Sequence, residues 1–122
     1  MTKDYAVKVF DVEEKDTAYA MGSGDLAVLA TPALVAMIEN TAKDSILDLL
    51  DEDQTTVGIE MQLNHVAATA VGHQVVCKTT LVKQEKSVLF FEFDATVQDQ
   101  VIAVGTHKRA IVVTEKFLDK LR

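Results

Sequence analysis

Two side chains suited to acid–base chemistry occupy positions where the sequence pattern predicts an apolar neighbourhood. Glu39 lies at the edge of the apolar stripe of a predicted helix, and His65 lies on the apolar face of a predicted strand. A buried carboxylate without partners costs several kcal/mol or takes up a proton, so each position needs an explanation. If both side chains face the same crevice between helix and sheet, they can act as a general base with its partner.

Each of these residues also has a purely structural interpretation. Glu39 can reach water from the edge of the stripe, and a core histidine such as His65 usually bonds to a carbonyl. Thr31 precedes Pro32, which is the pattern of an N-cap residue before a helix, although its hydroxyl could also hold substrate or a water. Eight residues of helix rise about 12 Å, so Thr31 cannot touch Glu39 along a straight helix.

Two further residues are candidates for contacts with a ligand. Gly58 falls inside a predicted strand, on the opposite face from His65, where a glycine marks a bulge or a close approach of backbone. Its N–H is then a possible donor to a carbonyl oxygen of a ligand. Arg109 lies on the last predicted strand. It is a candidate to hold a phosphate of a ligand or a partner subunit's carboxylate, unless it is simply exposed.

The elements that would position these residues follow from hydrophobic periodicity. A helical period predicts one amphipathic helix of about five turns, from Pro32 to near Leu50. Alternating patterns predict an antiparallel meander after it, with a hairpin turn at Asp99–Gln100. The predicted strands span residues 5–12, 57–67, 75–81, 89–97 and about 101–117.

Only the long helix can cover the apolar face of such a sheet, so the pattern predicts an α+β hotdog fold, an antiparallel sheet wrapped around one central helix. The open edges of the sheet predict a homodimer, with assembly beyond a dimer left open. A cone-shaped domain of small isomerases is the rival fold, but it generally needs more helix at the amino terminus than this sequence offers.

Composition limits the classes of function. The chain has 122 residues and no composition break, which predicts a single domain over 1–122. Its net charge of −7 argues against nucleic-acid binding. The lone Cys77, the lack of a signal-peptide pattern and the lack of a long apolar run predict a cytoplasmic protein without membrane contact. The three histidines lack metal-ligand spacing, so we expect no metal and no cofactor.

Three stretches resemble the fluoroacetyl-CoA thioesterase-like group of hotdog thioesterases. They are VLATPALVAMIENTA (28–42), GIEMQLNHVAATAVG (58–72) and GTHKRAIVVTEKF (105–117), and they occur in the family's order. The resemblance implies a dimeric enzyme that hydrolyses a small acyl-CoA thioester, with CoA as part of the substrate. It places the catalytic Thr, Glu and His of the family on Thr31, Glu39 and His65, and substrate-binding positions on Gly58 and Arg109.

The sequence departs from the family's pattern at two places. Pro32 stands where a glycine is expected, and residues 22–30 contain no aromatic side chain, so a fluoroacetyl substrate is not expected. The alternative to hydrolysis is a hotdog module that binds acyl-CoA without turning it over. A third function, enoyl-CoA hydration, lacks its usual aspartate–histidine pair here.

Overall fold

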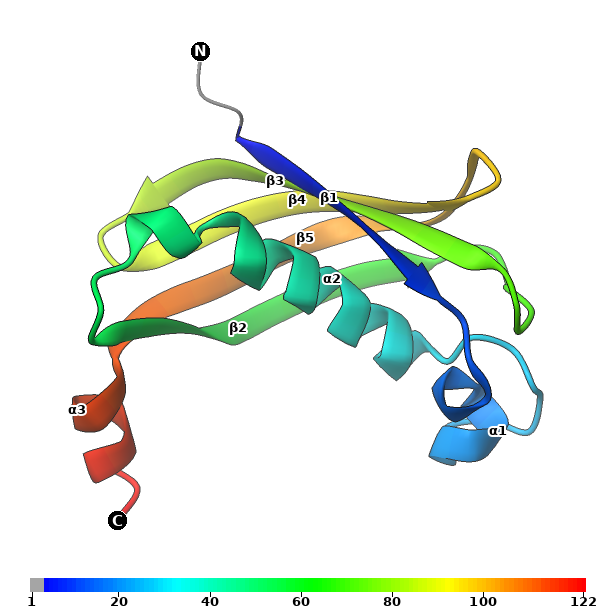
Figure 1. The fold of residues 1–122 in the computed structure, drawn as a ribbon, viewed down its shortest axis with the longest axis horizontal. Helices are drawn as coiled ribbons and strands as arrows, with labels where there is room; N and C mark the ends of the chain where they lie inside the picture. The colour runs from blue at the N-terminus through cyan, green and yellow to red at the C-terminus, as the bar shows by residue number, and fades with distance from the viewer. Residues whose placement is uncertain (1–3) are drawn as a thin grey trace.

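The chain folds as a five-stranded antiparallel sheet that curls around one long helix (Figure 1). The computed structural model describes residues 4–122. This arrangement confirms the predicted α+β hotdog architecture. The elements in chain order are β1 (Tyr5–Asp11), η1 (Glu14–Asp16), α1 (Ala18–Met21), α2 (Thr31–Ser45), η2 (Leu47–Leu49), β2 (Gln54–His65), β3 (Gln74–Glu85), β4 (Val88–Val97), β5 (Gln100–Val113) and α3 (Thr114–Asp119).

The strand order is β1-β3-β4-β5-β2, which differs from the predicted meander of consecutive strands. β3, β4 and β5 do form a meander, but β2 pairs with β5 because β1 and β4 already occupy both edges of β3. Residues 66–73 carry the chain from β2 across to β3, and Leu29 N–H donates to Thr69 O there at 2.8 Å. β2 is therefore an edge strand, and its outer edge carries no neighbour in the described chain.

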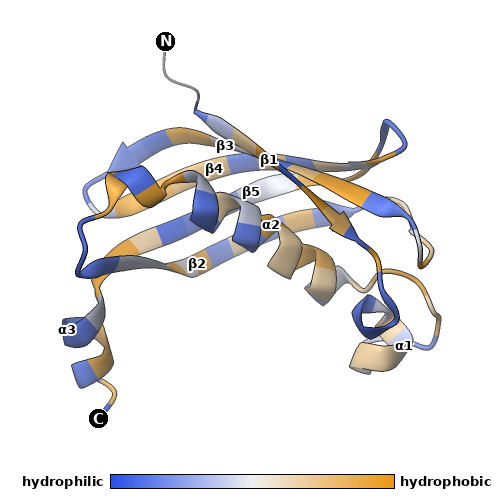
Figure 2. Cartoon of the chain, viewed as in Figure 1, coloured by the Kyte–Doolittle hydropathy of each residue, from blue (hydrophilic) through white to orange (hydrophobic). Residues whose placement is uncertain are grey.

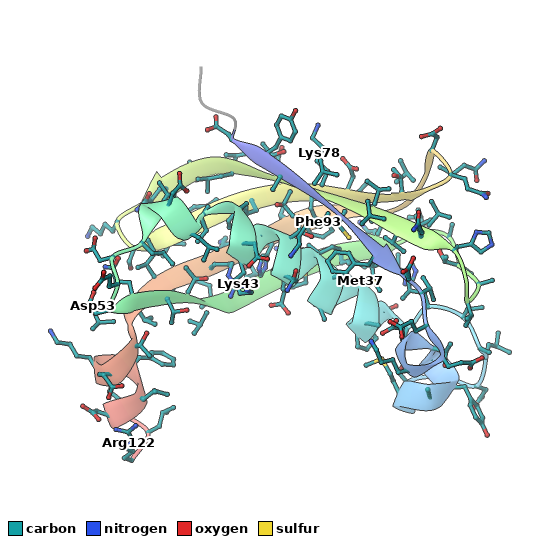
Figure 3. The ribbon with its side chains drawn as sticks, in the orientation of Figure 1. Met37, Lys43, Asp53, Lys78, Phe93 and Arg122 are labelled. Carbon is teal, nitrogen blue, oxygen red and sulfur yellow. The ribbon has the colours of Figure 1, made fainter. Side chains whose placement is uncertain are left out.

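The long helix supplies the middle of the core. Leu34, Ile38 and Ala42 of α2 are fully buried, as the predicted stripe requires. Figure 3 shows Met37 of α2 and Phe93 of β4 in the layer between helix and sheet, and both belong to the same buried cluster. In Figure 2 the amino-terminal half of α2 is mostly hydrophobic and its carboxyl-terminal half is mostly hydrophilic. None of the described helices has the length and apolar character needed to span a bilayer.

The helix ends earlier than its apolar pattern predicts. α2 stops at Ser45, whose hydroxyl donates to Ala42 O at 2.7 Å, and Ile46 leaves the helical region at φ −119° and ψ 18°. A 3₁₀ turn follows, so Leu49 is 48% exposed instead of buried. Ile46 still reaches the core and is 2% exposed, which explains why the pattern continued past the true end.

Two predicted boundaries near the carboxyl end were wrong, the position of the last hairpin turn and the end of the last strand. The hairpin turn lies at Gln98 and Asp99, whose positive φ angles of 49° and 64° fit a type I′ turn, so β5 already begins at Gln100. β5 ends at Val113, and the chain continues as α3 instead of extending the strand to residue 117.

Candidate active site

A β-bulge in β2 decides which way its side chains face. Gly58 pairs with Arg109 and Glu60 pairs with Lys108, so Ile59 is an extra residue without a partner on β5. Strict alternation would place Gly58 and His65 on opposite faces, as the sequence predicted. The extra residue reverses that relation, and both positions face α2.

Glu39 lies in the crevice between α2 and the sheet, directly over Gly58. A Cβ atom on Gly58 would lie 2.5 Å from Glu39 Oε2, so the carboxylate occupies the space that only a glycine leaves open. Arg109 Nη1 lies 3.8 Å from the same oxygen. The Glu39 side chain is 40% exposed, which leaves the carboxylate accessible to a ligand from the open side of the crevice.

Arg109 is buried, which corrects the default expectation of an exposed surface arginine. Its side chain is 7% exposed, and Thr56 fixes its plane with two acceptors. Arg109 Nε donates to Thr56 Oγ1 at 2.9 Å, and Nη2 donates to Thr56 O at 3.1 Å. Burial lowers the pKa of the guanidinium, and the nearby Glu39 opposes that shift. The guanidinium is thus held in one orientation toward Glu39.

A second pair of candidate residues meets at the start of α2. Thr31 Oγ1 lies 2.8 Å from His65 Nδ1. Ala30, and not Thr31, is the N-cap residue of α2, so the threonine hydroxyl is free for this contact. His65 Nε2 is buried. Burial lowers the pKa of the imidazole, and a backbone hydrogen bond with Ala67 opposes that shift.

These two residues line an open pocket of about 360 Å³. Its other walls are small or aliphatic, with Ala18, Val28, Ala67 and Ala68 among them. Among the described residues, no Phe or Tyr side chain lines it. The pocket therefore offers an apolar space next to a hydroxyl and an imidazole.

The predicted contact between Glu39 and His65 is absent within one chain. Gly58, under Glu39, pairs with Arg109, whereas His65 pairs with Ala103. Six residues of β5 separate those two partners, which corresponds to about 20 Å. One chain thus carries two half-sites, Glu39–Gly58–Arg109 beside the middle of β2 and Thr31–His65 at its carboxyl end.

Sequence reasoning missed two residues of the first half-site. His107 is buried beside Arg109, with its Nε2 at 3.2 Å from Arg109 Nη1, and Thr56 holds the other side of the guanidinium. The alternation of Gly105, His107 and Arg109 on one face was visible in the sequence and pointed to His107. Nothing in the sequence marked Thr56.

No group of three or more His, Cys, Asp or Glu side chains within residues 4–122 is arranged to hold a metal ion. Cys77 is buried in the core, and burial raises the pKa of its thiol to about 12. Cys77 is therefore not a candidate nucleophile for either half-site.

A single antiparallel sheet curled around α2, with polar side chains at the helix start and in the helix–sheet crevice, defines a hotdog-fold protein. Residues 12–115 match the model of the fluoroacetyl-CoA-specific thioesterase family, so the chain belongs to that family. No curated protein matches the chain in sequence.

Solved structures agree with this assignment. A point mutant of the fluoroacetyl-CoA-specific thioesterase FlK is 26% identical, with a TM-score of 0.91, over 100% of this chain and 95% of that chain. A thioesterase-superfamily protein of Thermus thermophilus is 22% identical, with a TM-score of 0.90, over 100% and 90% of the two chains. A hot-dog-like protein of Thermanaerovibrio acidaminovorans is 20% identical, with a TM-score of 0.87, over 96% and 87%. The last two show the fold alone. The family membership makes this chain a thioesterase, and acyl-CoA thioesters are the substrate class that the family indicates.

Proposed function

We propose that the protein hydrolyses a small acyl-CoA thioester as a homodimer, with each active site shared between two copies. One copy contributes Glu39, Gly58 and Arg109, and the other contributes Thr31 and His65. The observation that carries this proposal is the division of the candidate residues into two half-sites, separated by about 20 Å along the edge strand β2 and by about 12 Å along α2. Within one chain, the half-site that holds the Glu39 carboxylate lacks the Thr31–His65 pair.

The edge of β2 is suited to pairing with a second copy. β2 has 12 residues, contains no proline and lacks a neighbour on its outer side in the described chain. An edge of this length is normally covered or paired, because its free N–H and C=O groups recruit other strands. Ile59, in the middle of β2, and Val66, directly after its last residue, are 52% and 62% exposed, which is apolar surface that a dimer contact would bury.

Symmetry restricts how two copies of β2 can pair. A two-fold axis perpendicular to the sheet keeps every side chain on its own face, so directly opposed residues must share a face. An axis at Gln62 meets this condition and places Glu60 of one copy opposite Asn64 of the other. All three residues project from the face that points away from α2.

The same axis brings the two half-sites together. One position beyond the Glu60–Asn64 pair, His65 of the second copy lies opposite the bulge at Gly58 and Ile59. Because the bulge turns Gly58 toward α2, Gly58 and His65 of the second copy share the helix-facing side. The imidazole then approaches Glu39 across the dimer, together with its Thr31 partner.

The chemistry of this combined site is thioester hydrolysis. The thioester carbonyl lies against backbone N–H groups near the bulge or at the start of α2, which stabilise the oxyanion. Either Glu39 removes a proton from the attacking water, or its carboxylate attacks the carbonyl and water hydrolyses the resulting anhydride. In both routes the C–S bond breaks, the CoA thiolate takes up a proton, and the free acid leaves.

The acyl group occupies the pocket beside Thr31. Its walls of alanine and valine fit a small aliphatic acyl group, and nothing in them recognises fluorine in particular. The rival interpretation, a non-catalytic acyl-CoA-binding module, requires no carboxylate held over a glycine by a buried arginine. Enoyl-CoA hydration would consume the enoyl absorbance of crotonyl-CoA without releasing thiol.

Thiol release from a panel of acyl-CoAs tests the proposal. Wild type should release CoA, whereas Glu39→Gln and His65→Ala should be at least about 100-fold slower. Glu92→Gln is the matched control, because it changes an exposed carboxylate on the outer face of the same sheet, on β4 and away from the edge of β2. Equal turnover in wild type and both site variants would refute the proposed mechanism, and calorimetric binding without turnover would favour the binding module.

Cross-linking tests the proposed register. Directly opposed Cα atoms lie about 4.5–5.5 Å apart, within disulfide range, so Gln62→Cys should form a covalent dimer on oxidation. Asn64→Cys is the control, because its two copies would lie about 13 Å apart along the strands. Native Cys77 is buried and adds little background. Efficient cross-linking of the control and not of Gln62→Cys would contradict the register.

A further inference from the structure

His107 is the most deeply buried titratable side chain next to the Glu39–Arg109 pair, and the mechanism above gives it no part. It lies on β5 and is 1% exposed. The Phe91 ring of β4 stacks against it, with the centroids 6.0 Å apart. Burial of an imidazole without a function is tolerated where both ring nitrogens have partners. The identity of those partners is what gives His107 a role.

The hydrogen bonds of His107 fix its protonation state. Nδ1 lies 2.8 Å from the backbone oxygen of Glu60, and a carbonyl oxygen can only accept, so Nδ1 carries the proton. Nε2 lies 3.2 Å from Arg109 Nη1, and a guanidinium can only donate, so Nε2 presents its lone pair. Both contacts together require a neutral ring protonated at Nδ1.

Arg109 is consequently held at all three of its nitrogens. Thr56 accepts from Nε and Nη2, and His107 accepts from Nη1, the nitrogen that also faces Glu39 Oε2 at 3.8 Å. Thr56 holds the edge of the guanidinium formed by Nε and Nη2. His107 holds Nη1, which faces the Glu39 carboxylate.

We propose that neutral His107 is a positioning residue that aims Arg109 at Glu39 and thereby holds the reacting carboxylate over Gly58. This inference rests on the proposed role of Glu39. The groups that face His107 are Arg109 of its own strand, the Glu60 carbonyl of β2, Phe91 of β4 and, beyond Arg109, Glu39 of α2. A proton on Nε2 would remove the acceptor and place a second cation against Arg109.

The pKa of His107 supports this arrangement. Burial lowers it, the Arg109 charge lowers it further, and the Glu60 carbonyl and the Glu39 charge oppose the shift. The ring is therefore neutral at neutral pH, and acid disrupts the contact with Arg109.

Two isosteric variants separate the two contacts. In His107→Gln, the amide oxygen replaces Nε2 and can still accept from Arg109, but the bond to Glu60 is lost. In His107→Asn, the amide nitrogen replaces Nδ1 and can still donate to Glu60, but Arg109 loses its acceptor. We expect kcat of His107→Asn to fall about tenfold or more with KM little changed, and His107→Gln to retain most of kcat.

The pH dependence of kcat/KM distinguishes a positioning role of His107 from a merely structural one. On the acid side, the limiting slope of log kcat/KM against pH should decrease by one in His107→Gln, because one required neutral group no longer titrates. Wild-type activity in His107→Asn, or an unchanged acid slope in His107→Gln, would overturn the inference.

Two measurements keep the test decisive if a variant folds poorly. Nitrogen NMR of the wild-type ring should show a proton on Nδ1 and none on Nε2 at neutral pH, and the reverse would refute the proposal. In the Glu39→Gln background, His107→Asn should cause no further loss, and a full additional loss would mean that it acts independently of Glu39. Full activity of Glu39→Gln alone would instead refute the proposed function.

Discussion

Mixing two inactive variants should restore activity if each active site draws on two copies of the chain. The variants are Glu39→Gln and His65→Ala. Within one chain the two half-sites are separated by about 20 Å along β2 and by about 12 Å along α2, so Glu39 and His65 do not meet. Across the two-fold axis at Gln62, the same residues meet. The shared site therefore predicts complementation, and a site within one chain predicts none.

The expected magnitude follows from counting sites. In a dimer with one copy of each variant, one site combines the intact Glu39 with the intact Thr31 and His65, and the other combines both substitutions. Turnover per dimer should therefore be about half that of wild type. Each homodimer of a single variant carries a defect in both sites and should remain at its low basal rate.

The assay uses co-expression with two different affinity tags, sequential purification of the mixed dimer, and thiol release from the best acyl-CoA. The matched control is the mixed dimer of Thr31→Ala and His65→Ala. Thr31 and His65 belong to the same half-site, so every site in this dimer retains one defect and no recovery is expected. Recovery in the control, or no recovery in the Glu39→Gln and His65→Ala dimer, would refute the shared site.

Three further outcomes follow from the same geometry. Gly58→Ala should lower kcat about 10–100-fold, because its Cβ displaces the flexible carboxylate of Glu39, whereas the urea midpoint of unfolding should change little. An unchanged kcat would contradict the close approach of Glu39 to Gly58. Burial lowers the pKa of His65 and His107, so the unfolded chain binds more protons than the folded chain below about pH 6.5. The free energy of unfolding should therefore fall as the pH drops through that value, which urea denaturation at about pH 7.5 and 5.5 measures. Greater stability at the lower pH would be inconsistent with neutral histidines. Cys77, whose thiol pKa is raised to about 12, should resist thiol reagents in the native protein and react only after unfolding. Rapid labelling of this thiol in the native protein would show that its burial is incomplete.

The sequence alone determined the architecture because that depends on periodicity. The change from a helical period over residues 32–50 to alternation after residue 54 required one helix and a sheet that buries its apolar face on it. The same reasoning placed Glu39 at the flank of the apolar stripe, and the structure puts it in the helix–sheet crevice. The predicted helix was too long, because Ile46 continues the apolar pattern beyond Ser45, where α2 ends.

Only the tertiary structure decides the order of the strands and the face of the sheet on which the side chains of β2 lie. Local alternation cannot say that β2 pairs with β5 instead of β3, because pairing depends on which edges remain free after the other strands have assembled. Nor can it locate the extra residue at Ile59, which turns Gly58 to the same face as His65.

The sequence identified the residue types of the site, and tertiary contacts assigned their partners. Thr31, Glu39 and His65 were each recognisable from spacing and from a family resemblance, but the expected pair of Glu39 and His65 is separated along β2 within one chain. Arg109 is buried against Thr56 and His107 because β2 pairs with β5 there, and no one-dimensional pattern encodes which strands become neighbours. Periodicity records which face a side chain belongs to, whereas only the folded sheet determines which distant residue it meets on that face.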